Sequence, residues 1–266
     1  MRSSHHHKHH ARRLLCLTAL ACFVAGGTSY ACTRKAAVPQ LPALPAESLA
    51  QPAENGAQQS PLTAAQAQAL LDDPRMILVS RTHPITEDYP VETKECGSAT
   101  AINKTLQTEA AEAFLSMQAA AARDGVDVRM QSGYRSVSYQ TNLYEKKTNY
   151  YKQQGYDDAK AKEMAAAIVN PPGYSEHNCG LAADLNSPEH TGLDEGFENT
   201  VAFRWLCQHA GEYGFILRYP KGAEEKTEIT YEPWHWRYVG VENAAKINAS
   251  GLCFEDYIAA LQQIAG

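Results

Sequence analysis

Apolar residues recur every three or four positions over long parts of the chain, which is the pattern of amphipathic helices. The clearest case is residues 104–125, where helix-forming residues continue until Gly125. An earlier helix is predicted to start at Thr63, because Thr63 and Gln66 have the spacing of a capping box. Further helices are predicted over residues 138–169 with a break near Gly155, over residues 199–214, and in two short segments near the C-terminal end.

Short stretches of apolar or alternating residues between these segments predict strands, namely residues 75–80, 126–130, 215–219 and, with a break at Pro233, 227–240. Residues 174–186, YSEHNCGLAADLN, add a loop that leads into a further strand. Long helices mixed with separated short strands favour an α+β fold, in which helices pack around a small antiparallel sheet, over a doubly wound parallel sheet.

The first 61 residues follow a different pattern. Residues 1–31 contain four basic residues and no acidic one, then the apolar run LLCLTALACFVAGG, which is too short for a comfortable transmembrane helix. Residues 32–61 are rich in proline, alanine and glutamine and contain no aromatic residue. The sequence therefore predicts a signal peptide over residues 1–31, a disordered tether over residues 32–61 and one folded domain over residues 62–266.

Cys32 leaves the processing of this segment open. It follows Ser29, Tyr30 and Ala31, and Ser29 departs from the apolar residue usual three positions before a lipid-modified cysteine. Lipidation of Cys32 and plain cleavage after Ala31 fit about equally well. Either way we expect an exported protein, with membrane contact only through a lipid or an uncleaved signal.

Composition and charge narrow the range of partners. The chain is 44% hydrophobic and 20% charged, as in ordinary globular proteins. Without residues 1–31, which hold four of the 24 basic residues and none of the 30 acidic ones, the formal charge falls from −6 to −10. Such a charge argues against nucleic acid as a partner, and we expect a monomer. The cluster HHHKHH lies inside the predicted signal peptide, so it is excluded from the candidate site.

Cysteine usage fits an exported protein. If Cys32 carries a lipid, four cysteines remain that can form two disulfides in three connectivities: Cys96, Cys179, Cys207 and Cys253. The alternative is that they are free thiols, buried as small hydrophobic side chains.

His177 and Asp184 lie seven residues apart in YSEHNCGLAADLN. Taken alone, they fit a loop histidine and a turn cap as well as two metal ligands, and a metal site needs a third ligand. His235 is the strongest candidate, because the other histidines outside the signal peptide lie in polar loops or in mid-helix (His83, His190 and His209). Two imidazoles and one carboxylate suit zinc and leave a fourth position open, as in catalytic zinc sites.

Glu232 stands three residues before His235, and Pro233 between them is incompatible with a helix. An extended or turned unit would place this carboxylate beside the metal, where it could accept a proton from water. The alternative is a surface carboxylate at the end of a strand.

Three motifs together resemble one protein family. SEHNCGLAAD matches S-x-H-x-x-G-x-A-x-D and EPWHWR matches E-x-W-H in zinc D-alanyl-D-alanine carboxypeptidases of the VanY type, and SGYRS matches their third motif. The wider family includes D-Ala-D-Ala dipeptidases, bacterial murein endopeptidases and the hedgehog signalling domain. The resemblance covers roughly residues 74–260. Cys179 is a departure at an unconstrained position, and a disulfide or packing role is favoured for it over zinc binding.

The resemblance implies a catalytic domain with one zinc ion per chain, in a cleft on the sheet. It also implies a role for each matching position. The zinc ligands would be His177, Asp184 and His235; Glu232 would be the general base and later acid; Arg135 would stabilise the oxyanion or hold the substrate carbonyl; and Ser175, Ser132 and Gln140 would contact the peptide or its terminal carboxylate.

The implied function is that of a zinc metallopeptidase, a D,D-carboxypeptidase that removes the C-terminal D-alanine from peptidoglycan stem peptides ending in D-Ala-D-Ala. A dipeptidase or a peptidoglycan endopeptidase using the same site is the alternative within the enzyme class. A zinc-containing binding module without catalysis is the alternative outside it, although the presence of Glu232 and Arg135 argues against that reading. We expect the protein to act outside the cytoplasm, in the cell envelope or secreted.

Overall fold

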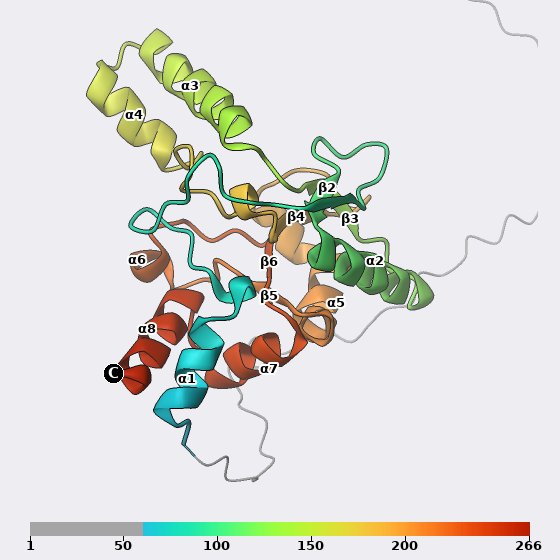
Figure 1. The fold of residues 1–266 in the computed structure, drawn as a ribbon. Helices are drawn as coiled ribbons and strands as arrows, with labels where there is room; N and C mark the ends of the chain where they lie inside the picture. The colour runs from blue at the N-terminus through green and yellow to red at the C-terminus, as the bar shows by residue number, and fades with distance from the viewer. Residues whose placement is uncertain (1–60) are drawn as a thin grey trace, which may run out of the picture. The chain divides into compact units, whose positions relative to one another are not determined.

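The computed structural model describes residues 61–266, drawn in colour in Figure 1. The predicted signal peptide, Cys32 and nearly all of the predicted tether lie outside that range. Within it, no helix is both long and apolar enough to cross a bilayer.

The centre of the fold is a four-stranded sheet with the order β3-β4-β6-β5. Its strands are short: β3 is Arg129–Ser132, β4 is Ala182–Asn186, β5 is Phe215–Leu217 and β6 is His235–Tyr238. All neighbouring pairs are antiparallel. Together with the surrounding helices, this confirms the predicted α+β class.

The two faces of this sheet differ in chemistry, because successive side chains of a strand point to opposite faces. Ala183 and Leu185 of β4 and Trp236 of β6 join the main apolar core. Asp184 and His235 alternate with them and form a polar face. The pleat therefore explains how an aspartate stands between two core residues without entering the core.

Helices cover the apolar face. Helix α2 (Thr108–Arg123) contributes Phe114 and Met117 to the main core, and α5 (Val201–His209) contributes Phe203 and Leu206. A second core lies between α1 (Ala64–Leu71), α7 (Val241–Ser250) and α8 (Phe254–Ala265) and includes Ile216 of β5, whose strand register places it on the opposite face of the sheet. The capping box predicted at Thr63 is present, and α1 packs closely on α8.

A pair of helices extends from the body of the domain (Figure 1). Helix α3 is Val137–Gln153 and α4 is Asp158–Ala166, with the predicted break at Gly155 between them. Gln140 lies near the start of α3 and is buried, and its amide nitrogen donates to the carbonyl oxygen of Asn170 at 2.6 Å. This bond joins α3 to the segment after α4.

Two strand predictions need correction, and one small sheet was not predicted. Residues 75–80 do not form a strand: η2 (Pro74–Met76) is a 3-10 turn, and Ser80 forms only an isolated bridge with His83. Pro74 and the Asp73 side chain, which accepts from the Arg75 backbone nitrogen, start this turn. The carbonyl groups of Arg75 and Ile77 accept hydrogen bonds from the Arg237 side chain rather than from a neighbouring strand.

Within residues 227–240, only β6 is a strand, because Thr227 ends α6 (Glu224–Thr227) and a loop follows it. The small two-stranded sheet β1 (Thr93–Glu95) and β2 (Thr105–Gln107) was missed. β1 is polar and fully exposed, so it lacks the alternation that predicts a strand, and β2 occupies the beginning of the segment predicted as a helix.

Candidate active site

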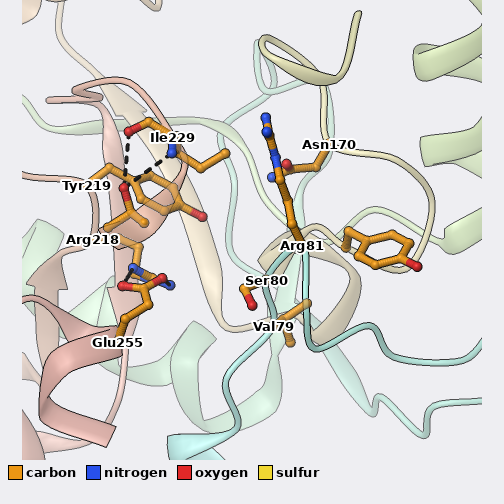
Figure 2. A pocket seen from close by; sticks show the side chains of 10 residues that line it. Val79, Ser80, Arg81, Asn170, Arg218, Tyr219, Ile229 and Glu255 are labelled. Carbon is orange, nitrogen blue, oxygen red and sulfur yellow. Dashed lines mark hydrogen bonds and ion pairs between the residues drawn. The ribbon is translucent and has the colours of Figure 1, made fainter. Parts of the chain in front are cut away.

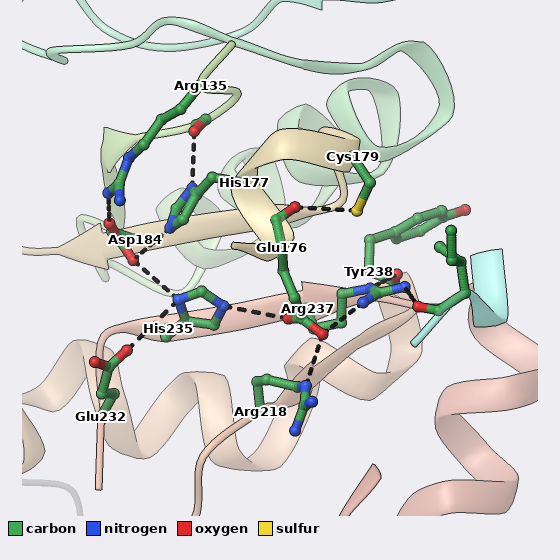
Figure 3. Close-up of polar contacts among 12 residues, drawn as sticks. Arg135, Glu176, His177, Cys179, Asp184, Arg218, Glu232, His235, Arg237 and Tyr238 are labelled. Atoms are coloured by element: carbon green, nitrogen blue, oxygen red, sulfur yellow. Dashed lines mark hydrogen bonds and ion pairs between the residues drawn. The ribbon is translucent and has the colours of Figure 1, made fainter. Parts of the chain in front are cut away.

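Three side chains converge on the polar face of the sheet (Figure 3). The ligand atoms of His177, Asp184 and His235 all lie within 4.8 Å of one another, and all three residues are buried. Asp184 Oδ1 is 3.2 Å from His177 Nε2 and 3.2 Å from His235 Nδ1. The three residues predicted as metal ligands are thus brought together around one point.

Strand register places two of these ligands. Asp184 of β4 is directly opposite His235 of β6 and, on its other side, opposite Ser132 of β3. Side chains of directly paired residues share a face, so Ser132, Asp184 and His235 form a polar row across the sheet.

A tight turn places the third ligand. His177 lies in η3 (Glu176–Cys179), a 3-10 turn that ends at Gly180 with φ 74°. A β-carbon on Gly180 would come within 3.0 Å of the backbone nitrogen of Gln107, and that nitrogen donates to the Gly180 carbonyl. Glycine is therefore needed both for the left-handed conformation and for the close approach of β2.

The SGYRS motif holds His177 from the opposite side. His177 Nδ1 is 2.8 Å from the carbonyl oxygen of Gly133. A β-carbon on Gly133 would approach the carbonyl oxygen of Thr105 to 2.2 Å, so only glycine fits there. The backbone nitrogen of Arg135 also donates to the His177 carbonyl at 3.0 Å. This motif and the HNCG turn therefore form one hydrogen-bonded unit.

Arg135 contacts the candidate site through Asp184. Its guanidinium group donates to Asp184 Oδ2 through Nη2 and to Ser132 Oγ through Nε, at 2.5 and 3.1 Å. Burial would raise the pKa of Asp184, but His177 and Arg135 hold that pKa well below its ordinary value. Asp184 is therefore a carboxylate, with one oxygen on the arginine and the other facing the two imidazoles.

Glu232 borders the same point. Its Oε2 atom is 3.6 Å from His235 Nδ1, and its side chain is 18% exposed. Burial raises the pKa of Glu232 to about 7. A carboxyl group with such a pKa can accept and return a proton near neutral pH. The alternative of a surface carboxylate does not describe its position.

A second group of charges lies behind His235. Glu176 is fully buried, and its Oε1 accepts hydrogen bonds from Arg218 Nε at 2.7 Å and Arg237 Nη1 at 2.6 Å. Its Oε2 is 3.3 Å from His235 Nε2. Arg218 continues the network through two hydrogen bonds to Glu255.

This network was not predicted from the sequence. Two signals for it were present, since Arg218 and Arg237 are basic residues within segments that otherwise read as buried strands. Buried arginines need acidic partners, and Glu176 is the acidic residue inside the matched SEHNCGLAAD motif.

The three predicted substrate contacts lie on different elements of the fold. Ser132 accepts the hydrogen bond from Arg135 described above, and Ser175 directly precedes the turn that carries His177. Gln140 lies at the base of α3, where its Oε1 has no hydrogen-bond partner in the described structure. Their roles in substrate binding stay predictions.

The four cysteines outside the first 60 residues are not paired with one another. The two-disulfide reading is therefore wrong for this structure. Cys96 and Cys179 are buried in the main core as small apolar side chains, which is the alternative considered above. Cys179 Sγ donates to the carbonyl of Glu176, and it is not part of the ligand group.

Figure 2 shows a narrow polar pocket. Tyr219 lines this pocket, and its ring centroid is 4.8 Å from that of His235, so the pocket lies next to the candidate metal ligands. Arg81, Asn170 and Tyr174 line other parts of the wall. The predicted cleft over the ligands themselves stays a prediction.

The donor set fits zinc. Two imidazole nitrogens and one carboxylate oxygen are ligands that zinc takes in catalytic sites with an open position. Burial lowers the pKa of His235, but the carboxylates of Asp184, Glu176 and Glu232 outweigh that effect and raise it to about 9. This surplus of negative charge around His235 favours a cation at the centre.

Comparison with known proteins gives consistent results. Residues 103–241 match the VanY family, described as D-alanyl-D-alanine carboxypeptidase. A D-alanyl-D-alanine carboxypeptidase of Enterococcus faecalis is 36% identical over 223 residues, which cover 83% of this chain and 79% of that protein.

Three solved structures have the same fold. A mutant of the vancomycin-resistance D,D-pentapeptidase VanY, in complex with Zn(II), is 37% identical with a TM-score of 0.59 and covers 69% of this chain and 98% of its own. VanYB in complex with D-alanine-D-alanine is 37% identical with a TM-score of 0.60, covering 70% and 97%. The LdcB LD-carboxypeptidase is 32% identical with a TM-score of 0.60, covering 68% and 84%.

Proposed function

The chain belongs to the VanY family of D-alanyl-D-alanine carboxypeptidases, and we propose that it is a zinc D,D-carboxypeptidase acting on peptidoglycan stem peptides that end in D-Ala-D-Ala. The observation that carries this proposal is the convergence of His177, Asp184 and His235, with their ligand atoms within 4.8 Å, beside the carboxyl group of Glu232. Zinc held by these ligands would act as a Lewis acid. It would lower the pKa of water, so that the water can lose a proton near neutral pH, and it would polarise the peptide carbonyl.

Glu232 is the proton carrier of the proposed reaction. It accepts the proton that water loses on attacking the carbonyl carbon, and it donates that proton to the amine nitrogen of D-alanine when the peptide C–N bond breaks. Burial raises the pKa of Glu232 above that of an exposed carboxyl group, so Glu232 is a stronger proton acceptor than an exposed glutamate.

Arg135 and the polar residues near it orient the substrate. The Arg135 guanidinium donates to Asp184 with one arm, and its remaining donors are suited to the oxygen that becomes negative during attack. Ser132 holds the arginine through its Nε and is 3% exposed. Ser175 and Gln140 are proposed to contact the peptide or its terminal carboxylate.

The alternatives use the same centre on other bonds. A D-Ala-D-Ala dipeptidase and a peptidoglycan endopeptidase need the same ligands and the same proton carrier. The similarity to an LD-carboxypeptidase adds a further activity that the same centre could have. A binding module without catalysis needs zinc but has no use for a partly buried carboxyl group beside it. The position of Glu232 favours an enzyme.

The N-terminal part of the proposal concerns location. We propose that residues 1–31 direct export, that residues 32–61 are a tether, and that the catalytic domain of residues 62–266 acts on the cell wall as a monomer. Membrane attachment then depends on whether Cys32 is lipidated or the chain is cleaved after Ala31.

The test uses the full-length, zinc-loaded protein and four peptides: a stem pentapeptide ending in D-Ala-D-Ala, the free dipeptide D-Ala-D-Ala, a stem tetrapeptide ending in one D-alanine, and a cross-linked dimer. Products are identified by mass. Release of D-alanine from the pentapeptide faster than from the others supports the proposal. Faster cleavage of another peptide assigns the corresponding alternative, and no cleavage of any peptide with zinc bound supports the binding module.

A further inference from the structure

The two candidate histidine ligands face the centre with different nitrogens. His177 directs Nε2 toward Asp184, and its Nδ1 lies against a backbone carbonyl. His235 directs Nδ1 toward Asp184, and its Nε2 lies against the carboxylate of Glu176. A neutral imidazole ligates through the nitrogen that lacks a proton, so the partner of the other nitrogen decides which tautomer is present.

The carboxylate of Glu176 is fixed in place. Its side chain is fully buried, as are those of Arg218 and Arg237, and both guanidinium groups donate to the same oxygen, Oε1. The second oxygen, Oε2, is left to face His235 Nε2 (Figure 3). The two oxygens therefore have separate partners, one for the arginines and one for the histidine.

We propose that Glu176 is a positioning residue for zinc, which accepts the Nε2–H of His235 and so fixes Nδ1 as its ligating nitrogen. A carboxylate that accepts a proton-bearing nitrogen of a metal-bound imidazole fixes the ring and makes it a stronger ligand. This inference rests on the zinc site of the proposed function.

The position of the ring supports the same role. His235 packs against Tyr219 with a centroid distance of 4.8 Å and against the edge of His177 at 5.0 Å. These contacts restrict the ring plane, but they do not distinguish the two nitrogens. In the described structure, Glu176 is the hydrogen-bond partner of Nε2, so it supplies the distinction.

Glu176 also balances two buried arginines, so a purely structural role is the competing explanation. The substitution Glu176→Gln separates the two. If the glutamine oxygen still accepts from the two arginines, its NH2 group faces His235 Nε2. That contact favours the tautomer with the proton on Nδ1, and a protonated Nδ1 cannot bind the metal. Loss of an outer partner of a metal ligand typically reduces metal affinity about 10- to 100-fold, and we expect a loss of that size.

The measurement is zinc affinity by chelator competition on full-length protein, with the cobalt-substituted absorption spectrum as a second readout. Glu255→Gln is the matched control, because it removes a carboxylate from Arg218 without contacting His235. A large loss of affinity and a changed cobalt spectrum in Glu176→Gln, with a much smaller change in Glu255→Gln, support the inference. A lowered melting temperature with unchanged affinity and spectrum overturns it.

A second measurement needs no substitution and covers the case in which Glu176→Gln does not fold. In 15N-labelled, cadmium-substituted parent protein, the His235 ring should show a proton on Nε2 and coupling of Nδ1 to cadmium. Coupling of the metal to His235 Nε2 would overturn the inference while leaving the proposed function intact. If the parent protein binds neither zinc nor cadmium at this site, the proposed function fails instead.

Discussion

The two faces of the central sheet are formed by the same strands but have different roles: one packs in the core, and the other carries the candidate zinc site. On one face, Leu185 and Trp236 are packed among apolar residues of the main core. On the other face, their direct neighbours Asp184 and His235 meet at 3.2 Å in the candidate zinc site. In β4 and β6, core residues and residues of the candidate site are therefore only one position apart. Substitutions at adjacent positions should have separable effects on stability and on chemistry.

The largest effect is expected from loss of a ligand on the polar face. His177→Ala or His235→Ala leaves two of the three proposed ligands, and we expect zinc affinity to fall by more than about 100-fold, the upper end of what loss of an outer partner costs. Metal content after dialysis, measured by atomic absorption, checks this. Stoichiometric zinc in both variants would show that the ligand assignment is wrong.

The second-largest effect is expected from Glu232→Gln on the same face, where turnover should be lost while zinc binding is kept. Glu232→Gln keeps the size of the side chain but removes the proton acceptor, and losing a positioned general base typically costs about 10²- to 10⁴-fold in rate. We expect kcat for D-alanine release to fall by that factor while zinc stays bound. Equal turnover in the variant and the parent would mean that water is deprotonated by another group.

The same comparison shows what the sequence could predict. Two pairs among the proposed site residues have local signals: His177 and Asp184 are seven residues apart, and Glu232 is three residues from His235. His235 itself was proposed by elimination among the other histidines, and the structure brings it together with His177 and Asp184. The pleat that separates Asp184 from Ala183 and Leu185 follows from strand alternation. Fold class and most helices followed from periodicity in the same way.

What the sequence did not reveal depends on contacts between distant parts of the chain. Glu176 meets Arg218 across 42 positions and Arg237 across 61. Arg237 also donates to the carbonyl groups of Arg75 and Ile77, in the segment wrongly predicted as a strand. Such pairings leave only a weak trace in a sequence, an unexplained charge within an apolar segment.

A substitution on the apolar face should lower stability and leave zinc binding intact, the reverse of what is expected for the polar face. Leu185→Ala removes a fully buried side chain next to Asp184, and such substitutions typically cost about 2–5 kcal/mol of unfolding free energy. We expect a marked shift in the urea midpoint, with zinc content near one per folded chain. If zinc is lost in conditions where circular dichroism shows a folded variant, the two faces are not separable.

The smallest effect is expected away from both faces, at the start of α1. Thr63 accepts a hydrogen bond from the backbone nitrogen of Gln66, and the Gln66 side chain accepts one from the Thr63 backbone. Thr63→Ala removes the first of these, and loss of such a cap typically costs about 1 kcal/mol. Because α1 packs on α8 against the second core, the change should lower the urea midpoint slightly and leave kcat/KM for the pentapeptide unaltered. A decrease in kcat/KM would show that the second core contributes to the geometry of the polar face, because Arg237 contacts both the Arg75 carbonyl near α1 and Glu176 behind His235.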